Sequence, residues 1–190
     1  MIRAFIAVEI APATVASIES AIAELKPTLP AIRWVAPANF HLTVKFLGAI
    51  EASQVVAIGE ALEVAITPFP RCTINAKGLG VFPTVRQPKI FWVGFDGAEL
   101  ARLAAAVDRT LVPLGFSVEP RKFTPHLTIG RWRHGEPSAG DLKVALERWR
   151  ERDFGATKID RVILFRSMLK PAGAQYSQLK VIKLNDQPIE

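Results

Sequence analysis

A short stretch of sequence that occurs twice constrains this chain more than any other feature. Residues 39–45 are NFHLTVK and residues 124–130 are TPHLTIG, so both copies carry His-Leu-Thr followed by an aliphatic residue. His126 lies 85 residues after His41, a spacing near half of the 190-residue chain. The repeat predicts two related lobes, each of which contributes one histidine-bearing strand.

The alternation of side chains along a β-strand predicts which residues of each copy share a face. Residues i and i+2 of a strand point to the same side. His41 and Thr43 are therefore expected on one face, with Leu42 directed into a core on the other. The second copy repeats this arrangement, so each strand presents one imidazole and one hydroxyl.

Two imidazoles and two hydroxyls suit the hydrolysis of a cyclic phosphodiester. One neutral histidine can take a proton from an attacking water, and a protonated one can give a proton to the departing oxygen. The hydroxyls of Thr43 and Thr128 can donate hydrogen bonds to the phosphate oxygens. A lone strand histidine is more often structural, but the paired motifs favour catalysis by His41 and His126. The third histidine, His134, is expected at the surface.

The order of expected strands and helices favours an α+β fold with largely antiparallel sheets. The sequence contains no glycine-rich phosphate loop, and Gly48 and the glycines at 78 and 80 are expected to end strands or form turns. The expected strands are 2–8, 40–47, 72–79, 89–95, 126–132, 158–166 and 175–184, and the expected helices are 12–29, 53–66, 97–114 and 138–150.

The amino-acid composition gives weaker evidence about binding partners than the repeat does. The chain has 24 basic and 18 acidic residues, a net charge of +6, which favours anionic partners such as RNA, nucleotides or a membrane surface. The single cysteine, Cys72, excludes an internal disulfide and a cysteine-based zinc site. No run approaches the roughly 18 residues needed to span a bilayer. We expect a cytoplasmic protein with no membrane association, no metal and no cofactor.

Several further motifs surround the two histidines in a specific order. They are RAFIA at residues 3–7, RWV at 33–35, NFHLTVKFLG at 39–48, FTPHLTIGR at 123–131, and LFRS at 164–167 with Pro171 and Tyr176 behind it. With these motifs, nearly the whole chain resembles the 2H phosphoesterases. Within them it resembles the bacterial and archaeal RNA 2′,3′-cyclic phosphodiesterases, also called 2′-5′ RNA ligases.

The resemblance implies a fold and a reaction. It implies one domain, residues 1–190, made of two intertwined pseudo-symmetric lobes, whose antiparallel sheets line a central cleft with helices outside. It implies hydrolysis of an RNA 2′,3′-cyclic phosphate to a 2′-phosphate, with His41 as general acid and His126 as general base. The reverse reaction would be an ATP-independent 2′-5′ ligation, with tRNA fragments among the candidate RNAs. A monomer is expected.

Other site residues follow from their positions near the motifs. Arg131 would face away from His126 on a regular strand, but a bulge or turn at Gly130 would direct it toward phosphate. Lys45 is expected on the same face as His41, as an RNA-phosphate contact, whereas Phe46 is expected in the core. Phe5 is expected either to form the floor of the cleft or to stack on a base, with a place in the ordinary core as the other alternative. Arg33, Arg121 and Lys122 are further candidates for phosphate contacts.

The sequence leaves four alternatives open. The same chemistry could act on a small cyclic nucleotide or on a 2′-5′-linked oligonucleotide. The chain could bind RNA ends without turnover, although modules of that kind depend on exposed aromatic side chains more than on imidazoles. It could act chiefly as a ligase on tRNA halves, or it could be a zinc hydrolase, the alternative that the residues favour least.

Overall fold

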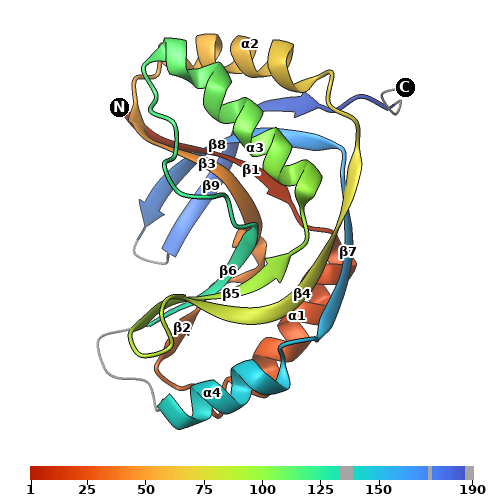
Figure 1. Cartoon of the computed structure of the whole chain (residues 1–190). Helices are drawn as coiled ribbons and strands as arrows, with labels where there is room; N and C mark the ends of the chain where they lie inside the picture. The colour runs from red at the N-terminus through yellow and green to blue at the C-terminus, as the bar shows by residue number, and fades with distance from the viewer. Residues whose placement is uncertain (133–138, 171–172, 187–190) are drawn as a thin grey trace.

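The computed structural model of the chain describes residues 1–132, 139–170 and 173–186. Within them the chain forms two antiparallel sheets and four α-helices (Figure 1). The first sheet has the order β3 (His41–Ile50), β1 (Ile2–Glu9), β8 (Arg161–Lys170), β9 (Gly173–Lys183). The second has the order β2 (Ile32–Trp34), β6 (His126–Trp132), β5 (Pro88–Phe95), β4 (Cys72–Pro83), β7 (Asp153–Ile159).

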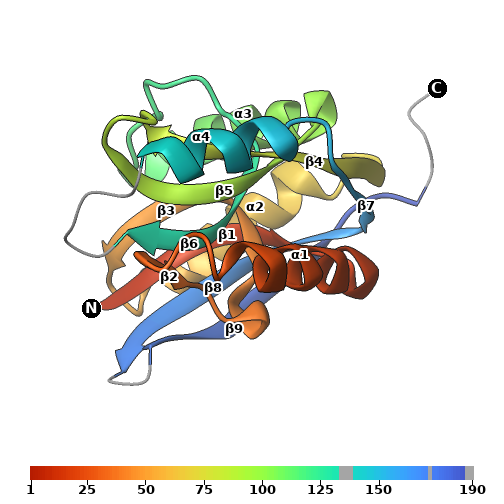
Figure 2. The same ribbon diagram turned by 90° about the horizontal axis from the view of Figure 1, so that it is seen from below.

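The helices cover the outer sides of the two sheets, and two of them pack against the sheet that does not contain the preceding strand. α2 (Gln54–Ile66) and α3 (Ala98–Leu111) lie over the first sheet, whereas α1 (Pro12–Leu25) and α4 (Ala139–Arg148) lie over the second (Figures 1 and 2). α1 follows a strand of the first sheet but packs against β7 of the second, and α3 follows β5 of the second sheet but packs against β3 of the first. Each lobe thus receives a helix from the other.

The central strand β1 separates two apolar layers because its side chains alternate. Ile6 and Val8 belong to the large core that the helices cover. Phe5 and Ala7 point to the opposite side and form a small cluster with Ile163 and Phe165, against which Tyr176 packs. We call this second side of the first sheet its inner face, and we use the same term for the side of the second sheet that bears His126.

The α+β class and the antiparallel sheets are confirmed, but two expected strands have other bounds, one strand was not expected, and one helix ends earlier than expected. Gly48 does not end its strand: β3 continues to Ile50, with Leu47 as an extra residue opposite β1 and Gly48 at a φ of 71°. The strand expected over 158–166 is two strands that separate at Asp160. Strand β2 was not expected, and α1 ends at Leu25 rather than near Leu29.

The turn expected at the glycines of residues 78–80 is wrong, because both glycines lie inside β4. Gly80 is directly opposite Trp92 on β5, and a Cβ atom added to Gly80 would lie 2.1 Å from Cζ2 of that indole. The absence of a side chain at Gly80 therefore lets Trp92 lie flat across β4. His134, which is expected at the surface, and Pro171 of the last family motif lie outside the described residues.

Candidate active site

The two motif strands meet where the sheets join. β3 is an edge strand of the first sheet, β6 lies next to the edge strand β2 of the second, and the two are in contact (Figure 1). His41 and His126 are the first residues of these strands, and each is partly buried. The fold therefore brings the two copies of the repeat together, as the sequence predicts.

Both imidazoles are held in the same way. His41 Nδ1 lies 2.8 Å from the carbonyl oxygen of Asn39, and His126 Nδ1 lies 2.8 Å from the carbonyl oxygen of Thr124. A carbonyl oxygen only accepts, so each Nδ1 carries the hydrogen and donates it to the residue two positions earlier. The Asn39 side chain in turn donates to the Ala174 carbonyl at 2.9 Å. Neither Nε2 hydrogen-bonds to another described residue, so each can exchange a proton with a substrate.

Aromatic side chains surround each imidazole. The Phe5 ring centroid lies 4.7 Å from that of His41, and Tyr176 meets His41 edge-on at 5.0 Å. Phe82 meets His126 edge-on at 5.0 Å, and Trp92 lies 6.4 Å from it. These contacts remove water from the imidazoles and limit their rotation. Of the alternatives for Phe5, the structure supports the core one, since Phe5 is only 3% exposed and its ring packs against His41.

Burial sets the charge of both histidines. It is the main reason that the pKa values of His41 and His126 fall below the ordinary 6.5, because a buried imidazolium loses hydration. The hydrogen bonds to the carbonyls raise both pKa values in part, and the positive charge of Arg131 lowers both. The charge of Arg131 therefore acts on both imidazoles.

A bulge follows the threonine in both motif strands. On β6, Thr128 pairs with Trp92 and Gly130 pairs with Phe91, so Ile129 is an extra residue. On β3, Thr43 and Lys45 pair with consecutive residues of β1, so Val44 is the extra residue. The last residue of each His-Leu-Thr-aliphatic motif is therefore a bulged residue, and the alternation of faces reverses after it.

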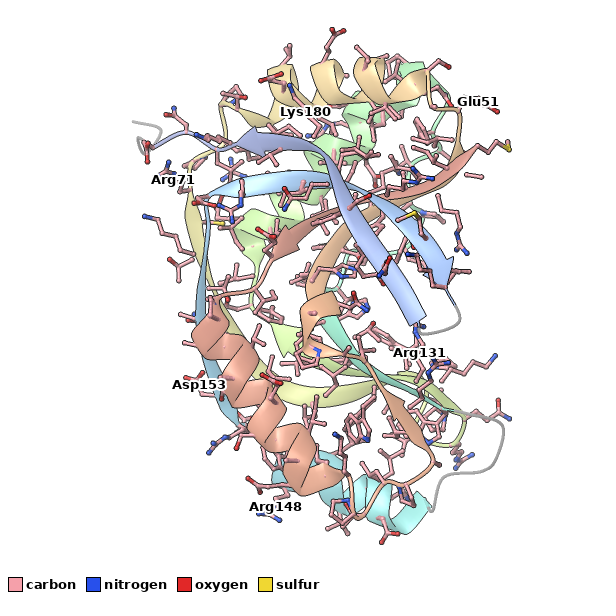
Figure 3. The ribbon with its side chains drawn as sticks, turned by 180° about the vertical axis from the view of Figure 1, so that it is seen from behind. Glu51, Arg71, Arg131, Arg148, Asp153 and Lys180 are labelled. Atoms are coloured by element: carbon pink, nitrogen blue, oxygen red, sulfur yellow. The ribbon has the colours of Figure 1, made fainter. Side chains whose placement is uncertain are left out.

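The bulge on β6 directs Arg131 to the inner face, as the sequence predicts, with Ile129 as the extra residue. Figure 3 labels Arg131 between the two sheets. Its charge also affects Tyr176 of the first sheet, which agrees with this position.

The equivalent bulge on β3 overturns the predictions for Lys45 and Phe46. Lys45 turns away from the site and is 8% exposed; its Nζ forms an ion pair with Asp108 on α3 and donates to the Ser117 carbonyl at 2.8 Å. Phe46 is 72% exposed and lies on the inner face, 6.2 Å from Phe5 between ring centroids. Phe46 thus occupies on β3 the position that Arg131 occupies on β6, two residues after the bulge.

The two motif threonines flank the histidines with free hydroxyls. Thr43 and Thr128 lie on the inner faces, each is partly buried, and neither side chain hydrogen-bonds to another described residue. Among the described residues there is no group of three or more histidine, cysteine, aspartate or glutamate side chains arranged to hold a metal ion. None of the helices described is long and apolar enough to cross a membrane.

Comparison with known proteins decides the family. The model of the LigT-like phosphoesterase family matches residues 8–92 and 95–176, which includes both motifs. The chain belongs to this family. An RNA 2′,3′-cyclic phosphodiesterase of Archaeoglobus fulgidus is 31% identical over 95% of this LigT-like phosphoesterase and 99% of its own length. One of Aeropyrum pernix is 34% identical over 76% of this chain and 82% of its own length.

Solved structures confirm the fold of this LigT-like phosphoesterase. The protein TT0787 of Thermus thermophilus matches with a TM-score of 0.81 over 98% of this chain and 100% of its own, at 23% identity. E. coli LigT in its apo form matches with a TM-score of 0.75 over 97% of this chain and 98% of its own, at 22% identity.

Several residues around the site were missed from the sequence. Phe82 and Trp92 form the surroundings of His126 from positions more than 30 residues away, in strands that carry no motif. The hydrogen bonds from the histidines to the carbonyl groups of Asn39 and Thr124 could have been found from the sequence, because each carbonyl lies two residues before a repeated histidine. Tyr176 appeared only as a family motif, with no sequence signal for its contact with His41.

Proposed function

We propose that this LigT-like phosphoesterase hydrolyses RNA 2′,3′-cyclic phosphate ends to 2′-phosphates by acid–base catalysis with two histidines. One observation carries the proposal: both imidazoles donate Nδ1–H to a carbonyl, neither Nε2 bonds to a described residue, and the charge of Arg131 acts on both. The relatives named above carry the same activity in their names. E. coli LigT, a structural relative, has been crystallised with 3′-AMP.

In the proposed reaction, Nε2 of His126 removes a proton from a water molecule, whose oxygen attacks phosphorus. The bond between phosphorus and the ribose 3′ oxygen breaks, and Nε2–H of protonated His41 gives its proton to that oxygen. The product is a 2′-phosphate with a free 3′-hydroxyl. The two histidines are equivalent in their hydrogen bonds, so this assignment of acid and base follows the family resemblance.

The remaining groups stabilise the negative charge on the phosphate. The hydroxyls of Thr43 and Thr128 donate to the non-bridging oxygens, and the guanidinium of Arg131 neutralises charge that develops there. The exposed ring of Phe46 offers a surface for the terminal base. The reverse reaction, which joins two ends by a 2′-5′ linkage, uses the same groups with the histidine roles exchanged. We propose that the protein acts as a monomer on RNA fragments, tRNA fragments among them, because one chain supplies the whole site.

Turnover of a short RNA with a 2′,3′-cyclic phosphate end, in the presence of EDTA, tests the proposal. We expect the wild type to form a 2′-phosphate, and His41→Ala and His126→Ala each to reduce kcat by about a hundredfold or more. Arg109→Gln, at an exposed position of α3 outside the site, serves as the control and should retain the wild-type kcat. Formation of a 3′-phosphate, full activity in either alanine variant, or loss of activity in EDTA would contradict the mechanism.

A further inference from the structure

Two arginine side chains, Arg33 and Arg131, lie side by side next to the proposed catalytic histidines. In the register of the second sheet, Arg33 on β2 is directly opposite Arg131 on β6. Residues directly opposite in antiparallel strands point to the same face with their Cβ atoms about 5 Å apart. Since Arg131 lies on the inner face, Arg33 lies there too. Both side chains are exposed.

The opposite face of the same strands confirms this orientation. Ile32 and Trp34 flank Arg33 and pack against the core, and Cγ2 of Ile32 would lie 2.4 Å from a Cβ atom added to Gly130. The apolar side of β2 therefore faces the covered layer, which leaves the arginine pair on the side of the active site.

Nothing in the described part of the chain neutralises this pair. Neither Arg33 nor Arg131 forms an ion pair with a described carboxylate, although eleven such pairs exist elsewhere in the described residues. The other cross-strand neighbour of Arg131 is Ile90 on β5, which carries no charge. Like charges directly opposite across two strands destabilise a sheet. A bound anion would remove that repulsion.

We propose that Arg33, next to Arg131, binds the phosphodiester that precedes the terminal nucleotide, so that the site recognises an RNA strand rather than an isolated cyclic nucleotide. This inference rests on the proposed function, in which Arg131 serves the terminal cyclic phosphate. β2 is the edge strand of its sheet, so Arg33 lies one strand farther out than Arg131 and farther from His126. A chain of phosphates extending from the active site across β6 toward the edge meets Arg131 first and Arg33 second.

A comparison of two substrates tests this second phosphate site. One is a nucleoside 2′,3′-cyclic monophosphate, which has no preceding phosphodiester, and the other is a five-nucleotide RNA with the same cyclic end. Arg33→Gln should raise the KM for the RNA about tenfold, as expected for one lost charge-assisted contact. It should leave kcat for the RNA and both constants for the monophosphate unchanged. Arg33→Lys should recover part of the loss.

The matched control is Arg109→Gln, which removes the same charge from an exposed position of α3 outside the site. It should change neither substrate's constants. Equal effects of Arg33→Gln on both substrates, or no effect on the RNA, would overturn the second phosphate site.

Equilibrium binding separates this inference from the proposed function, since it needs no turnover. A fluorescent five-nucleotide RNA with a 2′-phosphate should bind Arg33→Gln about tenfold more weakly than wild type, with a salt dependence reduced by about 0.7 in logarithmic slope. If the wild type hydrolyses neither substrate but this binding difference is seen, the proposed function fails and the arginine site stands. If binding is independent of Arg33, the arginine site fails whatever the activity.

Discussion

At the scale of single residues, the active site depends on how each imidazole is held. A hydrogen bond from Nδ1 to a carbonyl two residues earlier fixes the tautomer in both His41 and His126. The burial that excludes water lowers both pKa values. The free protein therefore holds both histidines mostly neutral at pH 7, and a substrate phosphate must raise the pKa of the one that serves as acid.

This balance predicts the pH dependence of kcat/KM. Both limbs of the wild-type profile should lie below pH 6.5, because kcat/KM reports the free enzyme and both pKa values are lowered there. Arg131→Gln removes a positive charge that disfavours the imidazolium, so both limbs should move to higher pH while the maximum falls. Profiles measured at constant ionic strength, with Arg109→Gln as control, check this. Limbs that stay in place would show that Arg131 does not act on the histidines, and a shift to lower pH would contradict the expected sign.

At the scale of the elements, the alternation of side chains predicts which face each residue of a motif strand takes as far as the bulge, but not beyond it. The repeat identifies His41, Thr43, His126 and Thr128, because all four precede the bulged residue. After the bulge, each side chain points to the face opposite the one that strict alternation predicts. Gly130 gave a signal for this on β6, but Val44 on β3 is an ordinary strand residue, so the burial of Lys45 could not be predicted.

Two further features of the strands could not be predicted from local sequence patterns. The break between β7 and β8 at Asp160 falls inside residues 158–166, which the sequence predicts as one strand. Gly80 looked like a turn residue, but its lack of a side chain serves the packing of Trp92 from another strand. Such requirements come from tertiary contacts, which periodicity does not record.

The buried ion pair between Lys45 and Asp108 links the strand that bears His41 to the segment before the strand that bears His126. Lys45 on β3 reaches Asp108 and the Ser117 carbonyl, and Asp108 also accepts from the Glu119 backbone N–H at 3.3 Å. These contacts hold the segment that leads to β6 against the strand that bears His41.

Lys45→Met should therefore destabilise the protein by about 3–5 kcal/mol, because it leaves the Asp108 carboxylate partly buried without its cation. Urea unfolding measures the loss, and Lys158→Met, at an exposed position of β7, is the control and should cost little. Adding Asp108→Asn should restore part of the stability by removing the unpaired charge. A cost below about 1 kcal/mol, typical of a surface pair, would show that the pair is solvated.

At the scale of the whole molecule, the chain passes repeatedly between its two sheets. α1 comes from the first sheet and covers the second, and α3 makes the opposite exchange. The large core accordingly contains residues of both lobes in one cluster. Neither lobe can bury its apolar residues without a helix whose ends are fixed in the other. We propose that the two lobes form one domain that unfolds as a unit.

The distribution of tryptophan makes this proposal testable. The chain has four tryptophans, and Trp34, Trp92, Trp132 and Trp149 all lie in or beside the second sheet. Their fluorescence therefore reports unfolding of the second lobe, while far-ultraviolet circular dichroism reports both. For one cooperative domain, the two urea transitions should coincide.

A substitution confined to the first lobe gives the sharper test. Leu62 is fully buried in α2, far along the chain from every tryptophan, and Leu62→Ala should cost about 2–5 kcal/mol. If the lobes unfold together, the tryptophan transition must move to lower urea by the full amount, although no tryptophan lies in the altered lobe. Val64→Ala, at an exposed position of the same helix, should leave the transition in place. If Leu62→Ala shifts only the dichroism transition, the lobes are separate folding units, and the joint site between them depends on docking rather than on a shared core.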